Sequence, residues 1–270
     1  MLGKRVFCAN KIITTTAILF FFVHANAYAG GNEMYQFFRH HMEAFISAGG
    51  AFSNLSNDET LRINSFVVNR YATNTNSQIE PLTGLGIGYV FNDIYEIDNR
   101  PFDLNLNLSA YYLNFDKVKG TEYPFVNAGS FDTLNYQFSA DSTFIMIEPR
   151  LLYTINCWQP YLLLGIGVSS NRLDSYNEEP TNSAGGAAPV PIMFGGHTMN
   201  AFAYEAGFGV QRQIFADQTN KLYYFLSLDY RYINLGEGQL ANFPAKTSGS
   251  HLTVSQLDTQ SIMLSLRVHF

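Results

Sequence analysis

Apolar and polar side chains alternate over the last residues of the chain. Between Ser261 and Phe270 every even position is apolar, and most odd positions are polar. A period of two is typical of a β-strand with one apolar face, because successive side chains of a strand point to opposite sides. We therefore predict a strand over residues 257–270. Its apolar face consists of Ile262, Leu264, Leu266, Val268 and Phe270.

Seven earlier segments show the same alternation, each with at least the length of about 9–11 residues that a tilted strand needs to cross a bilayer. The clearest is 102–112, where the apolar positions run from Phe102 to Tyr112 and the intervening positions include Asp103 and Asn105. The predicted strands are 43–52, 81–91, 102–112, 138–155, 159–170, 200–214, 222–232 and 257–270. Pro149 would delete a ladder donor in the fourth strand, so we expect a β-bulge there.

The connections between these segments alternate in length. Long polar stretches follow the odd strands, at 53–79, 116–136, 171–199 and 235–256. Short stretches follow the even strands, at 92–101, 156–158 and 215–221. Short periplasmic turns and long external loops are the rule for outer-membrane barrels. The pattern predicts an all-β, eight-stranded antiparallel up-and-down transmembrane β-barrel with four long extracellular loops and both termini in the periplasm.

The composition supports a lipid-facing surface. Aromatic residues make up 15% of the chain and charged residues only 14%, against a usual charged share of about 25%. No stretch after residue 29 approaches the length of a membrane helix. Only helices and closed barrels satisfy every backbone group in hydrocarbon, so the spanning elements are predicted to be strands.

The amino terminus has the features of a secretory signal peptide. Basic residues precede an apolar run at 12–23, and the small-residue pattern Ala27-Tyr28-Ala29 follows it. We expect residues 1–29 to be removed, leaving a short periplasmic segment at 30–41 and a barrel domain at 42–270. Removal takes away three of the 16 Lys and Arg and none of the 22 Asp and Glu, so the net charge becomes −9. Nucleic acid is therefore not an expected partner, and Cys157 is left as a single cysteine.

The chain resembles the small eight-stranded outer-membrane barrels of the OmpA-like and opacity-protein type, most specifically at 158–167 and 261–270. The resemblance implies location in the bacterial outer membrane, contact with its lipid and lipopolysaccharide, and insertion by the outer-membrane assembly machinery. It also implies host-surface molecules as partners of the loops. The assembly signal would comprise Phe270, Val268, Leu266 and Leu264.

The polar face of the predicted strands carries charges that would point into a lumen just wide enough for side chains. Buried charges are costly unless they are paired, so we predict a network of acids and arginines. Its members are Glu43, Asp103, Glu148, Arg150, Glu205, Asp229, Arg231 and Arg267, with His269 nearby. The network either fills the interior or lines a narrow ion path. Glycines share this face and would make room for Tyr111, Tyr161, Tyr223 and Phe225; they are Gly84, Gly86, Gly88, Gly165, Gly167, Gly207 and Gly209.

The favoured function is a non-enzymatic outer-membrane barrel that presents loops, with roles in envelope integrity, as a surface antigen or in adhesion. The third loop contains 177–180 and 185–189, whose composition favours mobility. One alternative is a pore or transporter for ions or small apolar solutes. A soluble, lipocalin-like carrier with its apolar face inside is another.

A lipid-modifying hydrolase is a lesser alternative. His197 and His251 lie in or beside predicted outer loops, near Ser248, Ser250 and Asp258, but no motif joins a nucleophile to a base. His40 and His41 are a weak metal candidate. The sequence thus predicts no catalytic residue, cofactor or metal site.

Overall fold

The computed structural model describes residues 40–53, 58–63, 66–73, 79–97, 100–128, 132–181, 194–242 and 251–270. The predicted signal peptide lies outside the described residues, as do most of the segment 30–41, residues 185–189, Ser248 and Ser250. Within the described part of the chain, no helix is long and apolar enough to cross a membrane.

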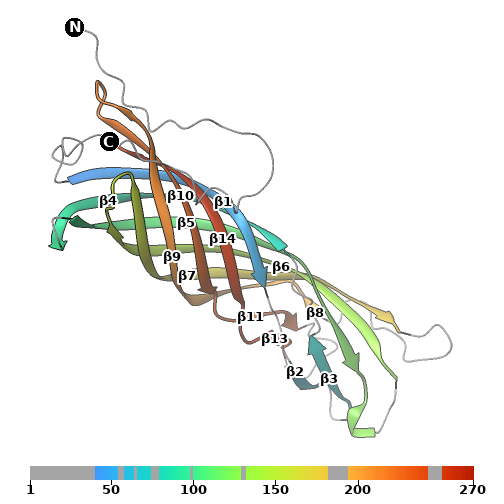
Figure 1. Ribbon diagram of the computed structural model, residues 1–270. Helices are drawn as coiled ribbons and strands as arrows, with labels where there is room; N and C mark the ends of the chain where they lie inside the picture. Colours follow the sequence, from blue (N-terminus) through green and yellow to red (C-terminus); the bar gives the residue numbers. More distant parts are fainter. Residues whose placement is uncertain are drawn as a thin grey trace.

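Eight long strands form a closed antiparallel ring (Figure 1). Each pairs with the next along the chain, and the last pairs with the first, which confirms the predicted eight-stranded up-and-down barrel. The eight are β1 (His40–Ser53), β4 (Ile79–Ile97), β5 (Arg100–Tyr123), β6 (Leu134–Tyr153), β7 (Trp158–Pro180), β9 (His197–Asp217), β10 (Leu222–Asn234) and β14 (Asp258–His269).

The register of the ring determines how far the strands tilt. The residue pairs that start at His41 on β1 run through all eight strands and return to β1 at Ala51, ten residues further along. With about 3.3 Å per residue and about 4.8 Å between strands, this stagger corresponds to a tilt of about 40°. A ring of this size leaves an interior that side chains fill.

The predicted apolar faces point outward around the ring. Leu162, Leu164 and Phe202 are each 63% exposed, although all are large apolar side chains. Similar residues on the other strands complete a belt, whereas the inward positions between them are buried. Hydrocarbon is the environment that makes such a belt favourable, so the ring is a membrane-spanning barrel. A soluble carrier with its apolar face inside is therefore the wrong alternative.

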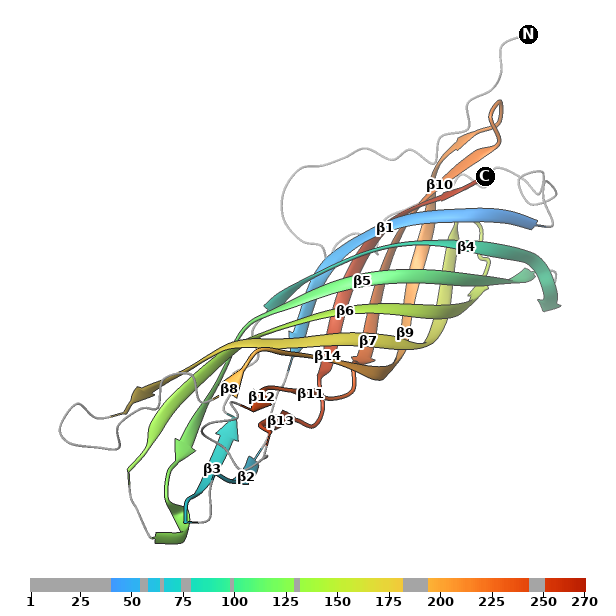
Figure 2. The ribbon, with the colours of Figure 1, turned by 180° about the vertical axis from the view of Figure 1, so that it is seen from behind.

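The two ends of the barrel differ. The end where β1 begins and β14 finishes carries three short connections, and we call it the turn end. The opposite end, which we call the loop end, carries the short strands, as Figure 2 shows. These are β2 (Asp58–Arg62), β3 (Val68–Thr73), β8 (Phe194–Gly195), β11 (Gly238–Gln239), β12 (Ala241–Asn242) and β13 (Thr253–Val254), with the 3-10 turn η2 (Val126–Ala128).

The predicted loops contain more regular structure than the sequence indicated. β5 runs to Tyr123 and β7 to Pro180, well past the predicted strand ends. The segment 177–180 is thus the end of a strand and not a mobile loop. The bulge expected at Pro149 is also wrong: Pro149 pairs with Leu106, and the register between β6 and β7 is the same on both sides of it. Pro149 faces outward. The pairing between β6 and β7 skips Glu148 and Pro149, and the register stays the same.

The strands β5, β6 and β7 exchange their polar and apolar faces where they leave the belt. On β6 the outward positions are apolar from Ile145 to Tyr153 but polar from Asn135 to Thr143. The inward positions change in the opposite sense, from Glu148 and Arg150 in the belt to Leu134, Tyr136, Phe138 and Ala140 beyond it. Burial nevertheless alternates without interruption along the strand. The loop end is therefore folded like a water-soluble sheet with its own apolar core.

That core joins the extended strands to the short ones. The hairpin of β2 and β3 pairs with the outer end of β5, and β8 pairs with β12. We call this assembly the cap. Its buried apolar side chains are Leu61, Ile63, Tyr71, Phe115, Val118, Tyr136, Phe138, Leu173, Tyr176, Phe194, Leu235, Leu240, Leu252, Val254 and Leu257.

Candidate functional site

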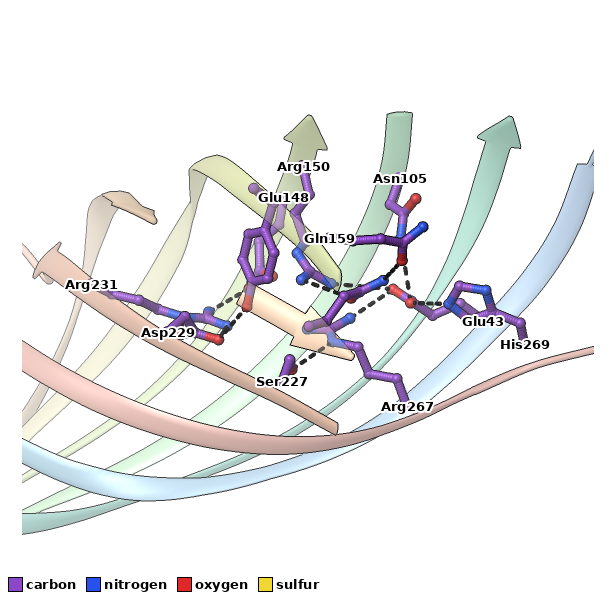
Figure 3. A network of polar contacts seen from close by, with 12 residues as sticks. Glu43, Asn105, Glu148, Arg150, Gln159, Ser227, Asp229, Arg231, Arg267 and His269 are labelled. Carbon is purple, nitrogen blue, oxygen red and sulfur yellow. Dashed lines mark hydrogen bonds and ion pairs between the residues drawn. The ribbon is translucent and has the colours of Figure 1, made fainter. Parts of the chain in front are cut away.

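Seven of the eight predicted network residues lie together in the lumen, and Figure 3 labels all of these except Glu205. Each is at most 2% exposed. They come from five strands, and they meet both between neighbouring strands and across the narrow lumen. They are Glu43 on β1, Glu148 and Arg150 on β6, Glu205 on β9, Asp229 and Arg231 on β10, and Arg267 on β14.

Glu43 is the acceptor of the cluster nearer the turn end. Arg267 donates to its Oε1 over 2.7 Å, and His269 Nε2 lies 2.9 Å from its Oε2. Asn105 donates to Oε2 over 3.3 Å, and Arg150 Nη1 lies 3.8 Å from Oε1. Arg267 also lies over the ring of Phe45, 4.1 Å from its centroid. The carboxylate of Glu43 therefore pairs with arginines from two strands, Arg150 on β6 and Arg267 on β14.

Arg231 is the centre of the second cluster. Its guanidinium is bonded to Asp229 and lies 3.3 Å from Glu205 and 3.4 Å from Glu148. It also donates to the hydroxyl of Tyr111 over 2.7 Å, which in turn donates to Glu148 over 2.6 Å. One guanidinium with five donors thus serves three carboxylates, which suits its planar fork.

Arg150 lies between the two clusters. Its guanidinium is 3.8 Å from the ring centroid of Tyr161, whose hydroxyl donates to Asp229 over 2.8 Å. It also donates to Gln211 over 3.2 Å. Polar contacts and the cation–π contact of Arg150 with Tyr161 thus connect the two clusters across the lumen.

Asp103 is the one predicted member that lies apart. It accepts the backbone N–H of Asp93 over 3.0 Å and the hydroxyl of Thr154 over 3.4 Å, at the turn end. The prediction that it pairs with an arginine is wrong, because it lies nearer the rim than the arginines do. It lines a cavity of about 80 Å³ with His41, Asn105 and His269.

The lumen glycines make room for some of the expected neighbours. A Cβ at Gly84 would lie 2.2 Å from the ring of Tyr111, and one at Gly209 would lie 2.6 Å from the ring of Tyr161. Other glycines admit charged or amide side chains, since a Cβ at Gly165 would meet Glu205 and one at Gly88 would meet Asn107. Tyr223 and Phe225 are not among the nearest neighbours of these glycines, so that part of the prediction is wrong.

The histidines considered for catalysis lie at the loop end. His197 begins β9 and is paired with Leu173 on β7, and His251 is exposed. Asp258 accepts from Asn234. The two serines named with them, Ser248 and Ser250, fall outside the described residues.

The tip of the cap, farthest from the belt, exposes apolar side chains. Phe66 is 84% exposed, and Tyr123, Phe125 and Val126 at the same end of the cap are exposed to a lesser degree. Asn127 bridges this tip, because its amide donates to the carbonyl of Phe66 and its Oδ1 accepts the N–H of Val68. The sequence interpretation missed this surface because it lies within the stretches predicted as loops, at 53–79 and 116–136, where no strand was expected.

No protein-family model matches the chain, and no curated protein matches it. Among solved structures, the fold is similar to Neisserial surface protein A, at 11% identity and a TM-score of 0.39, covering 84% of this chain and 95% of that chain. Ail, the attachment invasion locus protein of Yersinia pestis, has 14% identity, a TM-score of 0.32 and coverage of 83% and 97%. The outer membrane protease OmpT of Escherichia coli has 8% identity, a TM-score of 0.36 and coverage of 85% and 96%. Similarities this distant assign no activity to the chain, and the barrel fold follows from its own strand register.

Proposed function

We propose that the chain is a non-enzymatic barrel of the bacterial outer membrane that presents a rigid binding platform on the cell surface. The reversal of faces at the belt edge carries this proposal. β6 has 20 residues and β7 has 23, about twice the 9–11 that a crossing needs. The surplus extends roughly 30 to 40 Å along the strands and builds the cap. A strand that only closes a barrel has no need of this second core.

The cap has the properties of a surface for protein contact. Its tip carries four exposed apolar or aromatic side chains on a framework held by Asn127. Aromatic residues dominate the energetics of many interfaces, and a rigid surface loses little conformational entropy on binding. These features support adhesion to molecules outside the cell, with contact through Phe66 and Phe125.

The packing of the lumen supports a closed barrel as part of the proposal and disfavours a role in transport. Arginines and carboxylates meet at two successive levels, both between neighbouring strands and across the lumen, and their side chains are at most 2% exposed. An ion that entered would have to displace charge-assisted hydrogen bonds. Planar-bilayer recording of the refolded protein should show no steady conductance; a reproducible open channel would overturn the closed-lumen part of the proposal.

Orientation can be tested with the native cysteine. Cys157 lies at the turn end, and exposed Glu179 lies on the cap. In intact cells a membrane-impermeant maleimide should label the variant Glu179→Cys but leave Cys157 unlabelled until the outer membrane is permeabilised. Labelling of Cys157 alone in intact cells would show the opposite orientation.

Adhesion can be tested with substitutions at the tip. Bacteria that display Phe66→Ser or Phe125→Ser should bind cultured host cells less than bacteria that display the unmodified protein. Lys119→Ser, on the outer face of β5 away from the tip, is the matched control and should bind normally. Equal binding by the tip variants, at equal surface amounts, would contradict a role for the tip.

A further inference from the structure

Two buried carboxyl groups face each other in the core of the cap. Glu122 on β5 is 1% exposed and Glu178 on β7 is 5% exposed, and they lie within hydrogen-bonding reach of each other. They belong to neither cluster of the lumen. Two carboxylates this close in an apolar core are stable only when they share a proton, as other paired carboxyl groups do.

β-bulges aim both groups inward. On β5 the register with β6 shifts between Phe115 and Val118, so the inward positions change from odd to even. On β7 the register shifts opposite the segment between Gln137 and Ser139, and Ser175 has a positive φ of 61°. Without these shifts Glu122 and Glu178 would face solvent, where an ionised carboxylate pays no desolvation penalty.

The groups around the pair are donors and further acids. Tyr71 donates to Glu122 over 3.1 Å, and Tyr176 donates to Glu178 over 2.9 Å. Burial raises the pKa of Tyr136 on β6 to about 12, and it raises the pKa values of Tyr71 and Tyr176 well above their usual range. The phenols therefore stay protonated. Asp58 and Glu59 on β2 add negative charge that acts on Tyr136, and Glu59 accepts the N–H of Thr253 on β13.

The pair is linked to the tip through one residue. Asn69 on β3 donates through its amide to Glu122 over 2.5 Å, and its Oδ1 accepts the N–H of Phe125 over 3.2 Å. Phe125 has a positive φ of 55°, which is costly for a bulky side chain and persists only when its surroundings hold it. Asn69 therefore joins the hairpin, the carboxyl pair and the exposed tip.

We propose that Glu122 and Glu178 form a proton-sharing latch that closes the β2–β3 hairpin over the cap and opens when the shared proton leaves Glu122. Opening frees Asn69 and with it the conformation of the tip, so the latch controls the surface assigned to binding under the proposed function. A second carboxylate and burial oppose ionisation of the pair. Among the described barrel strands, the backbone of the hairpin pairs with the outer end of β5.

The pH window follows from the direction of the shift. Burial first, and then Glu178, raise the pKa of Glu122 from 4.5 to about 8. Ionisation of Glu122 destabilises the closed cap. The free energy of the closed state relative to the open state is therefore unaffected below about pH 4.5 and is raised by the full amount above about pH 8. The latch is accordingly closed in acid and loosens as the pH rises through this interval.

Hydrogen exchange of the refolded protein in detergent tests the latch without any partner, so its outcome is separable from that of the adhesion test. After correction for intrinsic exchange rates, protection of residues 69–73 and 120–123 should fall at least tenfold between pH 6 and pH 9. Residues 262–268 of β14 in the belt should not change. Equal protection of the cap at both pH values would overturn the proposal.

Variants separate the latch from general effects of pH. Glu122→Gln retains a group that can accept from Tyr71 but cannot ionise, so its cap should stay protected at pH 9. Glu178→Gln should do the same, and it replaces the first variant if that one fails to fold. Glu179→Gln, the exposed neighbour on the same strand, should behave like the unmodified protein. Loss of protection at pH 9 in a folded Glu122→Gln or Glu178→Gln variant would also overturn the proposal.

Discussion

Glu43 and Arg267 form a 2.7 Å hydrogen bond across the seam where the first and last strands of the barrel meet. Both side chains are fully buried. Closure of the ring by β1 and β14 leaves no open edge in the membrane, and this ion pair links the side chains of the two strands behind that seam. The pair is thus placed where a barrel that fails to close would first come apart.

Arg267→Ala should lower the free energy of unfolding by about 3–5 kcal/mol, because it leaves Glu43 buried with weaker partners. The double variant Glu43→Gln/Arg267→Met should recover much of that loss, since it removes both charges. Urea titration of the refolded protein, with heat-modified gel mobility as a second readout, measures both. Ser265→Ala, a smaller change on the same strand, is the control; a double variant no more stable than Arg267→Ala would contradict the ion-pair account.

Arg231→Ala should destabilise the barrel more than Arg267→Ala does. Arg231 is bonded to three carboxylates, whereas Arg150 and His269 still face Glu43 when Arg267 is lost. Adding Glu148→Gln and Glu205→Gln to Arg231→Ala should restore part of the stability, because fewer buried charges remain unpaired. The same urea titration ranks the variants, and a smaller effect for Arg231→Ala would show that the central cluster is not needed for stability.

The edge of the belt can be located by a charge scan on β6. Ile147→Lys places a charge on the lipid-facing side and should cost about 2–4 kcal/mol, whereas Thr143→Lys, beyond the belt edge, should cost about 0–1 kcal/mol. Both positions face outward, so packing inside the barrel is not disturbed. Unfolding measured in lipid vesicles gives the two values; equal costs would mean that the membrane extends past Thr143.

The terminal aromatic residue should matter for assembly more than for stability. Phe270 exchanges two backbone hydrogen bonds of 3.0 Å with Met42, and its ring is 55% exposed. Phe270→Ala keeps those backbone bonds but removes the ring, so it should reduce the amount of assembled barrel in cells while refolding in detergent stays close to normal. Phe270→Tyr serves as the conservative control. Normal assembly of Phe270→Ala would refute recognition of this residue by the assembly machinery.

Much of the barrel was predictable because a strand in a membrane must keep one face in lipid. That requirement imposes a period of two, and Leu162, Leu164, Ile166 and Val168 face outward as the period predicts. The same alternation placed Glu43 and Arg267 on the inner face. Their individual partners were not predictable, because the charges that meet are set by the register between strands and by the ten-residue stagger of the ring, which no single strand encodes.

The cap shows where sequence periodicity stops being sufficient. The reversal on β6 between Thr143 and Ile145 is present in the sequence, but its meaning depends on knowing that the strand continues beyond the membrane. The inward positions of Glu122 and Glu178 were harder still to predict, because strict alternation from Phe102 or from Tyr161 places each of them outward. Only the bulges of the folded sheet turn them inward.

The sequence by itself therefore determined the number of barrel strands, their outward faces and the polar character of the lumen, because each of these depends on local alternation against lipid. The tertiary structure decided which charges meet, where Asp103 lies, and that the long connections fold into a cap with a buried carboxyl pair. Those features depend on register and on bulges, which are set by contacts between strands far apart in the chain.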